Sequence, residues 1–174
     1  NLMPLAIRQI EDPVLRETAK PIPLAEITEP WVKKLVADMS AALVVCVDGV
    51  ALAAPQIGQS WRVFVVGERA FPTDNKDRIW PGDLVFINPT VIRRSRKKVE
   101  LPEGCLSVRN QYGLIKRHER VSVEAYDLDG RKFVRHASGL LAQVFQHETE
   151  HLDGILFTDQ ARDLHEVEPD KNHA

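Results

Sequence analysis

The pentapeptide His147-Glu148-Thr149-Glu150-His151 is the feature that most restricts what this chain can fold into. Two histidines four residues apart project from one face of an α-helix, so both imidazoles can reach the same metal ion. Glu148 follows the first histidine and can reach a metal-bound water without binding the metal, which is the position of a general base. Two surface histidines at this spacing are the alternative, so the surrounding sequence has to decide.

The residues before the motif predict that it lies on a helix. Four side chains at helical spacing form one continuous stripe that ends in the two histidines: Leu140, Val144, His147 and His151. Ser138 is the predicted N-cap and Gly154 the predicted stop. Neutral imidazoles on an apolar stripe need partners, because unpaired buried polar groups are costly. A metal ion is a common partner for such a pair.

A catalytic zinc-like centre takes three protein ligands and leaves one position for water. The longer HExxHxxGxxH pattern is matched as far as Gly154, but Phe157 stands where the next histidine is required. A glutamate from a later helix could only be Glu166 or Glu168, in a polar tail with little room for such a helix. The remaining candidate lies upstream in a Gly-containing loop. It is Cys105, and thiolate is a strong ligand for zinc or iron(II).

Three segments of the chain follow one another in a fixed order. They are Gly49-Val50-Ala51-Leu52-Ala53-Ala54-Pro55-Gln56, Glu103-Gly104-Cys105-Leu106-Ser107 and Gln146-His147-Glu148-Thr149-Glu150-His151. Together they resemble the three signature motifs of the peptide deformylases (polypeptide deformylases). The residues around Ile87-Asn88-Pro89, Arg117 and Ala137-Ser138-Gly139-Leu140 are also similar, so the resemblance spans about Ile7 to Asp159. Three ordered motifs are far more specific than any one of them.

The resemblance implies a metal-dependent amide hydrolase. Such an enzyme removes the N-formyl group from the N-terminal formyl-methionine of nascent polypeptides and releases formate, a step of N-terminal methionine processing in protein biosynthesis. The expected cofactor is one divalent transition metal per chain, iron(II) in the cell, although ligand softness also permits zinc(II), nickel(II) or cobalt(II). The expected fold is α+β, with small mixed or antiparallel sheets packed around a central C-terminal helix that carries HExxH. Residues 1–174 are expected to form a single catalytic domain.

The resemblance also assigns roles within the site. The metal ligands are Cys105, His147 and His151, in agreement with the spacing argument. Glu148 takes a proton from the attacking water and passes it to the leaving amine. The Gln56 side-chain amide and the Leu106 backbone N–H stabilise the charge that develops on the formyl oxygen, together with the metal. Loss of one such donor typically lowers the rate by about 10²–10³.

Family members bind the peptide as an extended strand, with the methionine side chain in an apolar pocket. The matching positions here are Val50, Ala51, Leu101, Gly104, Leu140, Gln143, Val144 and His147. Gln143 stands where an apolar residue is usual, and Ala51 replaces a glycine that would permit close backbone approach. Glu150 replaces a more common aspartate. We therefore predict that formyl-Met peptides are substrates, with weaker discrimination against polar first residues.

Composition restricts the binding partners of the protein and the cellular compartment in which it is expected. Lys and Arg number 23 against 25 Asp and Glu, a net charge of -2 that implies no general affinity for DNA. The sequence has neither a membrane-spanning apolar run nor a signal-peptide pattern. Two cysteines, one assigned to metal, favour a reducing, cytoplasmic compartment of bacterial type, and Cys46 is predicted to be a small core residue. A transit peptide removed before Asn1 would instead place the protein in an organellar stroma or matrix.

The rest of the chain predicts a mixture of helix and strand. A helix should begin at Pro30, with Leu35, Met39, Leu43 and Cys46 at helical spacing. Strands are predicted at 62–66, 84–87, 91–99 and 121–125, the last followed by an Asp129-Gly130 turn into 132–134. An exposed loop is expected over 71–82. The tail at 159–170 is expected to be a charged surface helix or a disordered end.

Two groups of charged residues have alternative interpretations. The basic run from Arg93 to Lys98 is ordinarily a solvated strand face, and the alternative is a transient contact with ribosomal RNA. Glu103 and Arg117 form either an ordinary salt bridge or a pair that orients a metal-bound histidine.

Two other functional classes are open. An HExxH metalloprotease would need the downstream ligand that the sequence lacks. A structural metal site in a binding module would need a fourth ligand such as Cys46, and Glu148 would then have no role.

Overall fold

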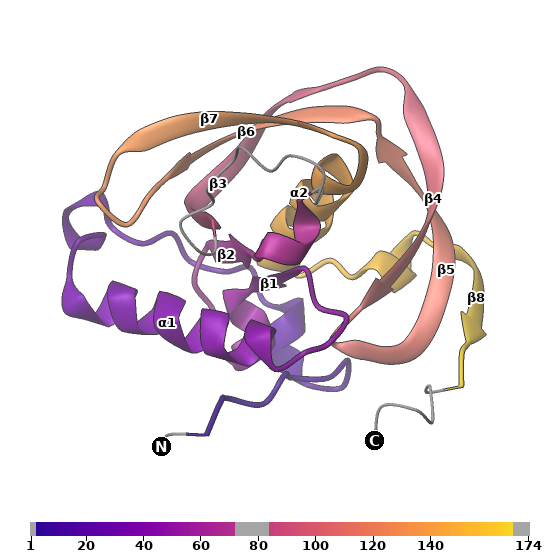
Figure 1. Ribbon diagram of the computed structural model, residues 1–174, viewed down its shortest axis with the longest axis horizontal. Coiled ribbons are helices and arrows are strands. Elements are labelled where there is room, and N and C mark those ends of the chain that lie inside the picture. The colour runs from indigo at the N-terminus through magenta and orange to yellow at the C-terminus, as the bar shows by residue number, and fades with distance from the viewer. Residues whose placement is uncertain (1–2, 72–83, 169–174) are drawn as a thin grey trace.

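The computed structural model describes residues 3–71 and 84–168 as an α+β protein (Figure 1). Its helices are α1 (Pro30–Val44) and α2 (Gly139–Leu152). Its strands are β1 (Ala51–Ala53), β2 (Val63–Val66), β3 (Leu84–Arg94), β4 (Lys98–Cys105), β5 (Val108–His118), β6 (Arg120–Tyr126), β7 (Lys132–Ser138) and β8 (Arg162–Glu166). Short 3-10 helices lie at Pro13–Arg16, Leu24–Glu26, Ala54–Ile57, Glu68–Ala70 and Phe157–Asp159. Within the described ranges, no helix is long and apolar enough to cross a membrane.

Two antiparallel sheets enclose α2. The first has the strand order β1-β2-β3-β6-β7, and the second has the order β4-β5-β8. Figure 1 shows α2 near the centre, between the first sheet and the long, curved β4–β5 hairpin. The predicted fold class, with the HExxH helix at the centre, is confirmed.

The first sheet is covered on both faces, which explains the uninterrupted apolar run of β2. Successive side chains of a strand point to opposite faces. Phe64 and Val66 belong to the core that includes the inner residues of α2, whereas Val63 and Val65 belong to the core built on α1. Neither face of β2 meets water, so alternation with polar residues is not needed.

Aromatic packing fixes α2 against this sheet. The Phe86 ring stacks on Phe64 with centroids 4.6 Å apart and meets Phe145 of α2 edge-on at 4.9 Å. Such pairs contribute about 0.5–1.5 kcal/mol beyond the area that they bury. Gln146 ties the other side of the helix to β5, because its side-chain amide exchanges hydrogen bonds of 2.8 and 2.9 Å with the backbone of His118.

The ends of α2 lie where the sequence predicts them. Ser138 occupies the N-cap position in extended conformation, although its side chain makes no capping hydrogen bond. Gly154 follows the helix with a φ of 72°, and a Cβ atom there would lie 2.6 Å from the carbonyl oxygen of Arg16. Only glycine combines this backbone conformation with such a close approach.

The prediction that Cys46 is a helical core residue is wrong. Helix α1 begins at the predicted proline but ends at Val44, and Cys46 lies in the turns that follow. The Cys46 N–H donates to the Leu43 carbonyl, and the Gly49 N–H donates to the Cys46 carbonyl. These bonds form turns, and the α-helix does not continue. Cys46 is consequently half-buried on the wall of a cleft.

The predicted division of the strands near Asn88 is also wrong. β3 continues through Asn88, which has a φ of 51° and exchanges two 2.8 Å hydrogen bonds with the backbone of Ile22. The strand predicted over 91–99 is interrupted by a turn in which the Ser95 hydroxyl donates to the carbonyl of Lys97. A run of arginine and lysine carries no apolar period, so its sequence does not mark this turn.

Residues 162–166 of the charged tail form a strand, not the predicted helix or disordered end, and residues 169–170 of that prediction lie outside the described residues. β8 pairs with the outer edge of β5, with Gln111 opposite Glu166 and Leu114 opposite Arg162. An edge strand offers unpaired backbone groups, and these determine the conformation of a tail without its own apolar pattern. The predicted loop at 71–82 falls, apart from Phe71, outside the described residues.

Candidate metal centre

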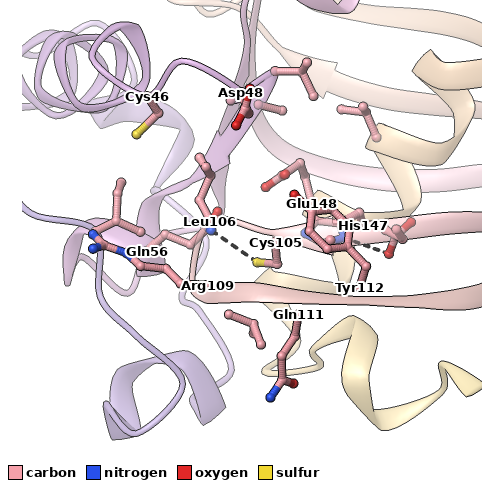
Figure 2. Close-up of a pocket in the computed structure, with 18 of the residues that line it drawn as sticks. Cys46, Asp48, Gln56, Cys105, Leu106, Arg109, Gln111, Tyr112, His147 and Glu148 are labelled. Atoms are coloured by element: carbon pink, nitrogen blue, oxygen red, sulfur yellow. Dashed lines mark hydrogen bonds and ion pairs between the residues drawn. The ribbon is translucent and has the colours of Figure 1, made fainter. Parts of the chain in front are cut away.

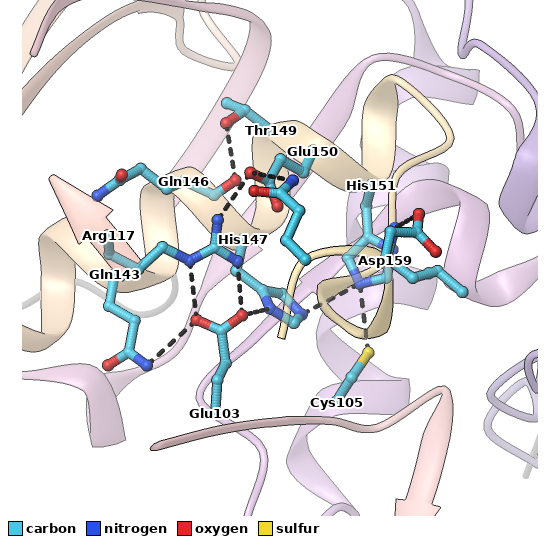
Figure 3. A network of polar contacts seen from close by, with 12 residues as sticks. Glu103, Cys105, Arg117, Gln143, Gln146, His147, Thr149, Glu150, His151 and Asp159 are labelled. Atoms are coloured by element: carbon cyan, nitrogen blue, oxygen red, sulfur yellow. Dashed lines mark hydrogen bonds and ion pairs between the residues drawn. The ribbon is translucent and has the colours of Figure 1, made fainter. Parts of the chain in front are cut away.

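Three side chains with metal-binding atoms converge where the end of β4 meets α2. His151 Nε2 lies 3.3 Å from Cys105 Sγ and 3.2 Å from His147 Nε2 (Figure 3). The three donor atoms all lie within 4.8 Å of one another. Ligands of a tetrahedral zinc ion with ordinary bond lengths would be roughly 3.3–3.6 Å apart. The arrangement therefore fits one transition-metal ion, held by the three residues that the sequence predicts.

The alternative ligands do not join this group. Cys46 is absent from the cluster of donor atoms, and its thiol instead donates to the Ala42 carbonyl at 3.3 Å. Glu166 ends the exposed strand β8, and Glu168 follows it. Among the described residues, the donor set thus has three members and leaves room for a water or substrate ligand, as catalytic centres require.

The electrostatic surroundings of the two histidines favour a bound cation. Burial lowers the pKa of His147, but hydrogen bonds with Cys105 and Glu103 outweigh burial and raise that pKa well above its usual value. Burial, followed by the positive charge of His147, lowers the pKa of His151 well below its usual value. His151 is consequently neutral, as a metal ligand must be. The anionic groups around His147 favour a positive charge beside its ring. A metal ion bound between the two histidines would supply that charge.

Glu148 has the environment of a general base. Its side chain is buried, and among the described residues its Oε2 atom has no hydrogen-bond partner. Burial, reinforced by the charge of Glu103, raises the pKa of Glu148 to about 7, against the opposing effects of His147 and Arg117. A carboxylate poised near neutrality can both accept and return a proton. Figure 2 shows Glu148 beside His147 at the cleft.

Glu103 orients His147 and is itself held by Arg117. Glu103 Oε2 accepts from His147 Nδ1 at 2.8 Å and from Arg117 Nη2 at 2.5 Å, while Glu103 Oε1 accepts from Arg117 Nε at 3.1 Å. Burial raises the pKa of Glu103, but the hydrogen bonds from His147 and Arg117 outweigh it and lower that pKa to about 2. Arg117 also reaches Glu150 at 2.7 Å. The pair is therefore more than an ordinary salt bridge, because it directs Nε2 of His147 toward the other donors.

The two predicted donors for the formyl oxygen lie beside Cys105. Gln56 Oε1 accepts from the Ala53 N–H at 2.9 Å, and this bond turns Gln56 Nε2 toward Ser107 Oγ at 3.1 Å and Cys105 Sγ at 3.7 Å. Within the described chain, the Leu106 N–H donates to no backbone or side-chain acceptor. The Gln56 amide is therefore fixed at the edge of the metal centre, and the Leu106 N–H beside it has no acceptor among the described residues.

Two supporting residues were not predicted. Ser107 is fully buried and accepts a hydrogen bond from the Gln56 amide, and its place two residues after the cysteine in the second motif could have suggested a role. Gln9 donates to the Leu106 carbonyl at 3.1 Å and thereby holds the peptide group between Leu106 and Ser107, next to the one that carries the Leu106 N–H. Gln9 comes 97 residues before Leu106, and no local pattern marks it.

A cleft of about 540 Å³ opens beside the metal centre (Figure 2). Six of the predicted substrate-binding residues line it together with His147: Val50, Ala51, Gly104, Leu140, Gln143 and Val144. Leu101 is half-buried in β4 and is not among the lining residues. Polar residues that were not predicted also line the cleft, namely Asp48, Arg109, Gln111 and Tyr112, together with Cys46.

A base beside three metal-binding side chains in an open cleft defines a metal-dependent hydrolase. The sequence profile of the family described as polypeptide deformylase matches residues 4–167. The chain is 42% identical over 155 residues to a peptide deformylase of Dictyoglomus thermophilum, covering 89% of this chain and 91% of that one. It is 43% identical over 163 residues to a peptide deformylase of Thermomicrobium roseum, covering 91% and 88%. The Met-Ala-Ser-bound crystal structure of a class I type b peptide deformylase from Acinetobacter baumannii matches with a TM-score of 0.80 and 31% identity, covering 90% and 97%.

The chain therefore belongs to the polypeptide deformylase family. It is a metal-dependent hydrolase that removes the N-formyl group from the N-terminal formyl-methionine of nascent polypeptides and releases formate. The family implies a catalytic metal, and the Cys105, His147 and His151 group is compatible with one.

Replacing Arg117 with methionine should destabilise the protein strongly. The change leaves the buried carboxylate of Glu103 without its bidentate partner, and removal of one member of a buried ion pair typically costs about 3–5 kcal/mol. The matched control is Arg162→Met, because Arg162 pairs with Glu100 on the surface, and exposed pairs of this kind contribute little to stability. Denaturant unfolding of the metal-free proteins measures both, and equal losses would contradict the special role of Arg117.

Proposed function

We propose that Cys105, His147 and His151 hold the catalytic metal and that Glu148 is the general base. The observation that carries this assignment is the convergence of the three donor atoms next to a buried carboxylate oxygen that has no hydrogen-bond partner among the described residues. When bound, a divalent metal lowers the pKa of a coordinated water and polarises a carbonyl group. The protein supplies the remaining functions, and residues 1–174 act as a single catalytic domain.

Glu148 carries a proton through the reaction. Water attacks the formyl carbon, and its proton passes to Glu148, whose pKa of about 7 suits both acceptance and release. Glu148 then gives this proton to the amine nitrogen as the carbon–nitrogen bond breaks. The immediate products are formic acid and a free amine. The acid then loses the second proton of the water, which the amine takes up, so formate and a protonated N-terminus are released and atoms and charges balance.

Gln56 and Leu106 stabilise the negative charge that develops on the formyl oxygen. The Gln56 amide is held by Ala53 and Ser107, and Gln9 holds the peptide group that directly follows the Leu106 N–H. Donors that are fixed before the reaction need little reorganisation in the transition state, which is the source of their catalytic effect.

The peptide substrate binds in the cleft as an extended strand. β1 is the edge strand of the first sheet, and Val50 and Ala51 at its start line the cleft. An edge strand can pair with an added peptide strand. The relative from Acinetobacter baumannii with Met-Ala-Ser bound supports a short peptide as the ligand here. The first side chain of the substrate then packs against Leu140, Gln143 and Val144.

The substrates are nascent chains, so we also propose a transient ribosome contact and a bacterial-type cytoplasmic location. The contact would involve the basic run at 93–98, whose arginine and lysine side chains are exposed around the turn between β3 and β4. Exposed cations attract RNA phosphates without reading sequence. The bacterial relatives support the location.

Iron(II) is the proposed metal in the cell. A thiolate with two imidazoles accepts iron(II), zinc(II), nickel(II) or cobalt(II), so the ligands alone do not select among them. The protein purified without oxygen should contain about one iron per chain and release formate from a formyl-Met peptide. Metal analysis and formate release measure both properties before and after exposure to air. An active protein that contains zinc and no iron would contradict iron(II) but not the site.

A further inference from the structure

Gln143 occupies a position that connects the cleft wall with the metal centre. It precedes His147 by one helical turn and lines the same cleft. Its Nε2 atom donates to the Pro102 carbonyl at 3.0 Å and to Glu103 Oε1 at 3.1 Å. Figure 3 shows the amide nitrogen of Gln143 directed at Glu103. Both hydrogens of the amide are therefore used within the protein.

The bond from Gln143 completes the partners of the Glu103 carboxylate. Arg117 supplies two N–H groups, His147 supplies one and Gln143 supplies the fourth. A carboxylate has about four lone-pair positions, so Glu103 is fully satisfied. The Gln143 bond reaches Oε1, whereas the His147 bond leaves from Oε2. Rotation of the carboxylate would break bonds at both oxygens, and its orientation is consequently fixed.

These contacts change what Gln143 offers to a substrate. Its two donors are already engaged, so a methionine side chain meets the aliphatic part of Gln143 and the Oε1 acceptor. The predicted weaker discrimination against polar first residues therefore depends on Oε1 alone. An apolar residue at this position would contact the substrate equally well but would leave the Pro102 carbonyl and one Glu103 lone pair without this partner.

We infer that Gln143 is a positioning residue of the metal centre, acting through Glu103 on the ring of His147. This inference rests on the proposed assignment of His147 as a metal ligand. Outer partners of metal-bound histidines typically change metal affinity or activity by about 10–100-fold when they are lost. Gln143 acts one contact farther out, and Arg117 remains in its absence. We therefore expect loss of the Gln143 amide to speed metal release by roughly 3–10-fold, below that range.

Metal release from Gln143→Met tests the inference. Methionine keeps the length and the apolar contacts of glutamine but removes both hydrogen bonds. The metal-loaded proteins are mixed with excess chelator, and the rate of metal transfer is followed by absorbance. Gln59→Met is the matched control, because Gln59 is exposed in the turn before β2 and outside the cleft. We expect faster release from Gln143→Met only, with kcat for a formyl-Met peptide lowered more than KM is raised.

Gln143→Glu provides an independent variant in case methionine prevents folding. At pH 8 the new carboxylate faces Glu103 without a donor, so release should be faster than in the unaltered protein. Protonation at lower pH restores a donor, so the ratio of the two release rates should fall toward one. Release at the unaltered rate in the folded variants would overturn the inference. If the unaltered protein itself bound no metal, the proposed ligand assignment would fail instead.

Discussion

Replacing Glu148 with glutamine should leave the metal in place and lower kcat by roughly 10²–10⁴, the usual contribution of a positioned acid or base. Glutamine has nearly the same shape as glutamate, and Glu148 is not among the three converging ligands. Its carboxylate is buried beside them, with one oxygen that has no hydrogen-bond partner in the described part of the chain, and an amide at that place cannot accept the proton of water. Both proton transfers of the reaction are therefore affected. Metal content is measured by atomic spectroscopy and turnover by formate release.

A neighbouring carboxylate on the same helix provides the comparison. Glu150→Gln changes a residue whose described contacts lead to Arg117 and Gln160, away from the three ligands. Glu150→Gln should lower activity less than Glu148→Gln does, by about 10–100-fold at most, because Glu150 acts only through the partners of Glu103. If the metal-loaded Glu148→Gln protein turned over at a near-normal rate, Glu148 could not be the base.

Helix α2 was predictable because its sequence carries two independent signals, a helical period and a stop. Val144, His147 and His151 follow the helical period, and Gly154 supplies the stop. The two histidines of the site therefore follow from local sequence. Cys105 does not, because it reaches the histidines only after β4 and β5 have folded around α2. Its role was suggested by elimination and by the order of the three motifs.

Features that depend on tertiary contacts were predicted poorly. The continuation of β3 through Asn88 depends on hydrogen bonds with Ile22, which is 66 residues away. The tail became strand β8 because β5 has a free edge beside it. The side-chain direction of Gln143 was also open, since a glutamine on this helix face can donate either to a substrate or to Glu103. Periodicity identifies a face of a helix but not the hydrogen bonds that each side chain makes.

Replacing Cys105 with alanine should remove the metal or greatly weaken its binding. The change leaves two histidine ligands, His147 and His151, whereas catalytic centres of this type use three protein ligands. Thiolate is also the donor with the highest affinity for soft divalent metals in this set. We expect metal content well below one per chain after dialysis, and loss of formate release with it.

Cys46→Ser is the control that separates the two cysteines. Cys46 lies on the cleft wall, and its thiol bonds to the carbonyl of Ala42 without joining the donor group. This variant should keep its metal and most of its activity, since serine can donate the same hydrogen bond. Loss of metal from Cys46→Ser with retention in Cys105→Ala would move the site to the other cysteine. The described donor distances, 3.3 Å from Cys105 Sγ to His151 Nε2 and 3.2 Å between the histidine nitrogens, support the opposite result.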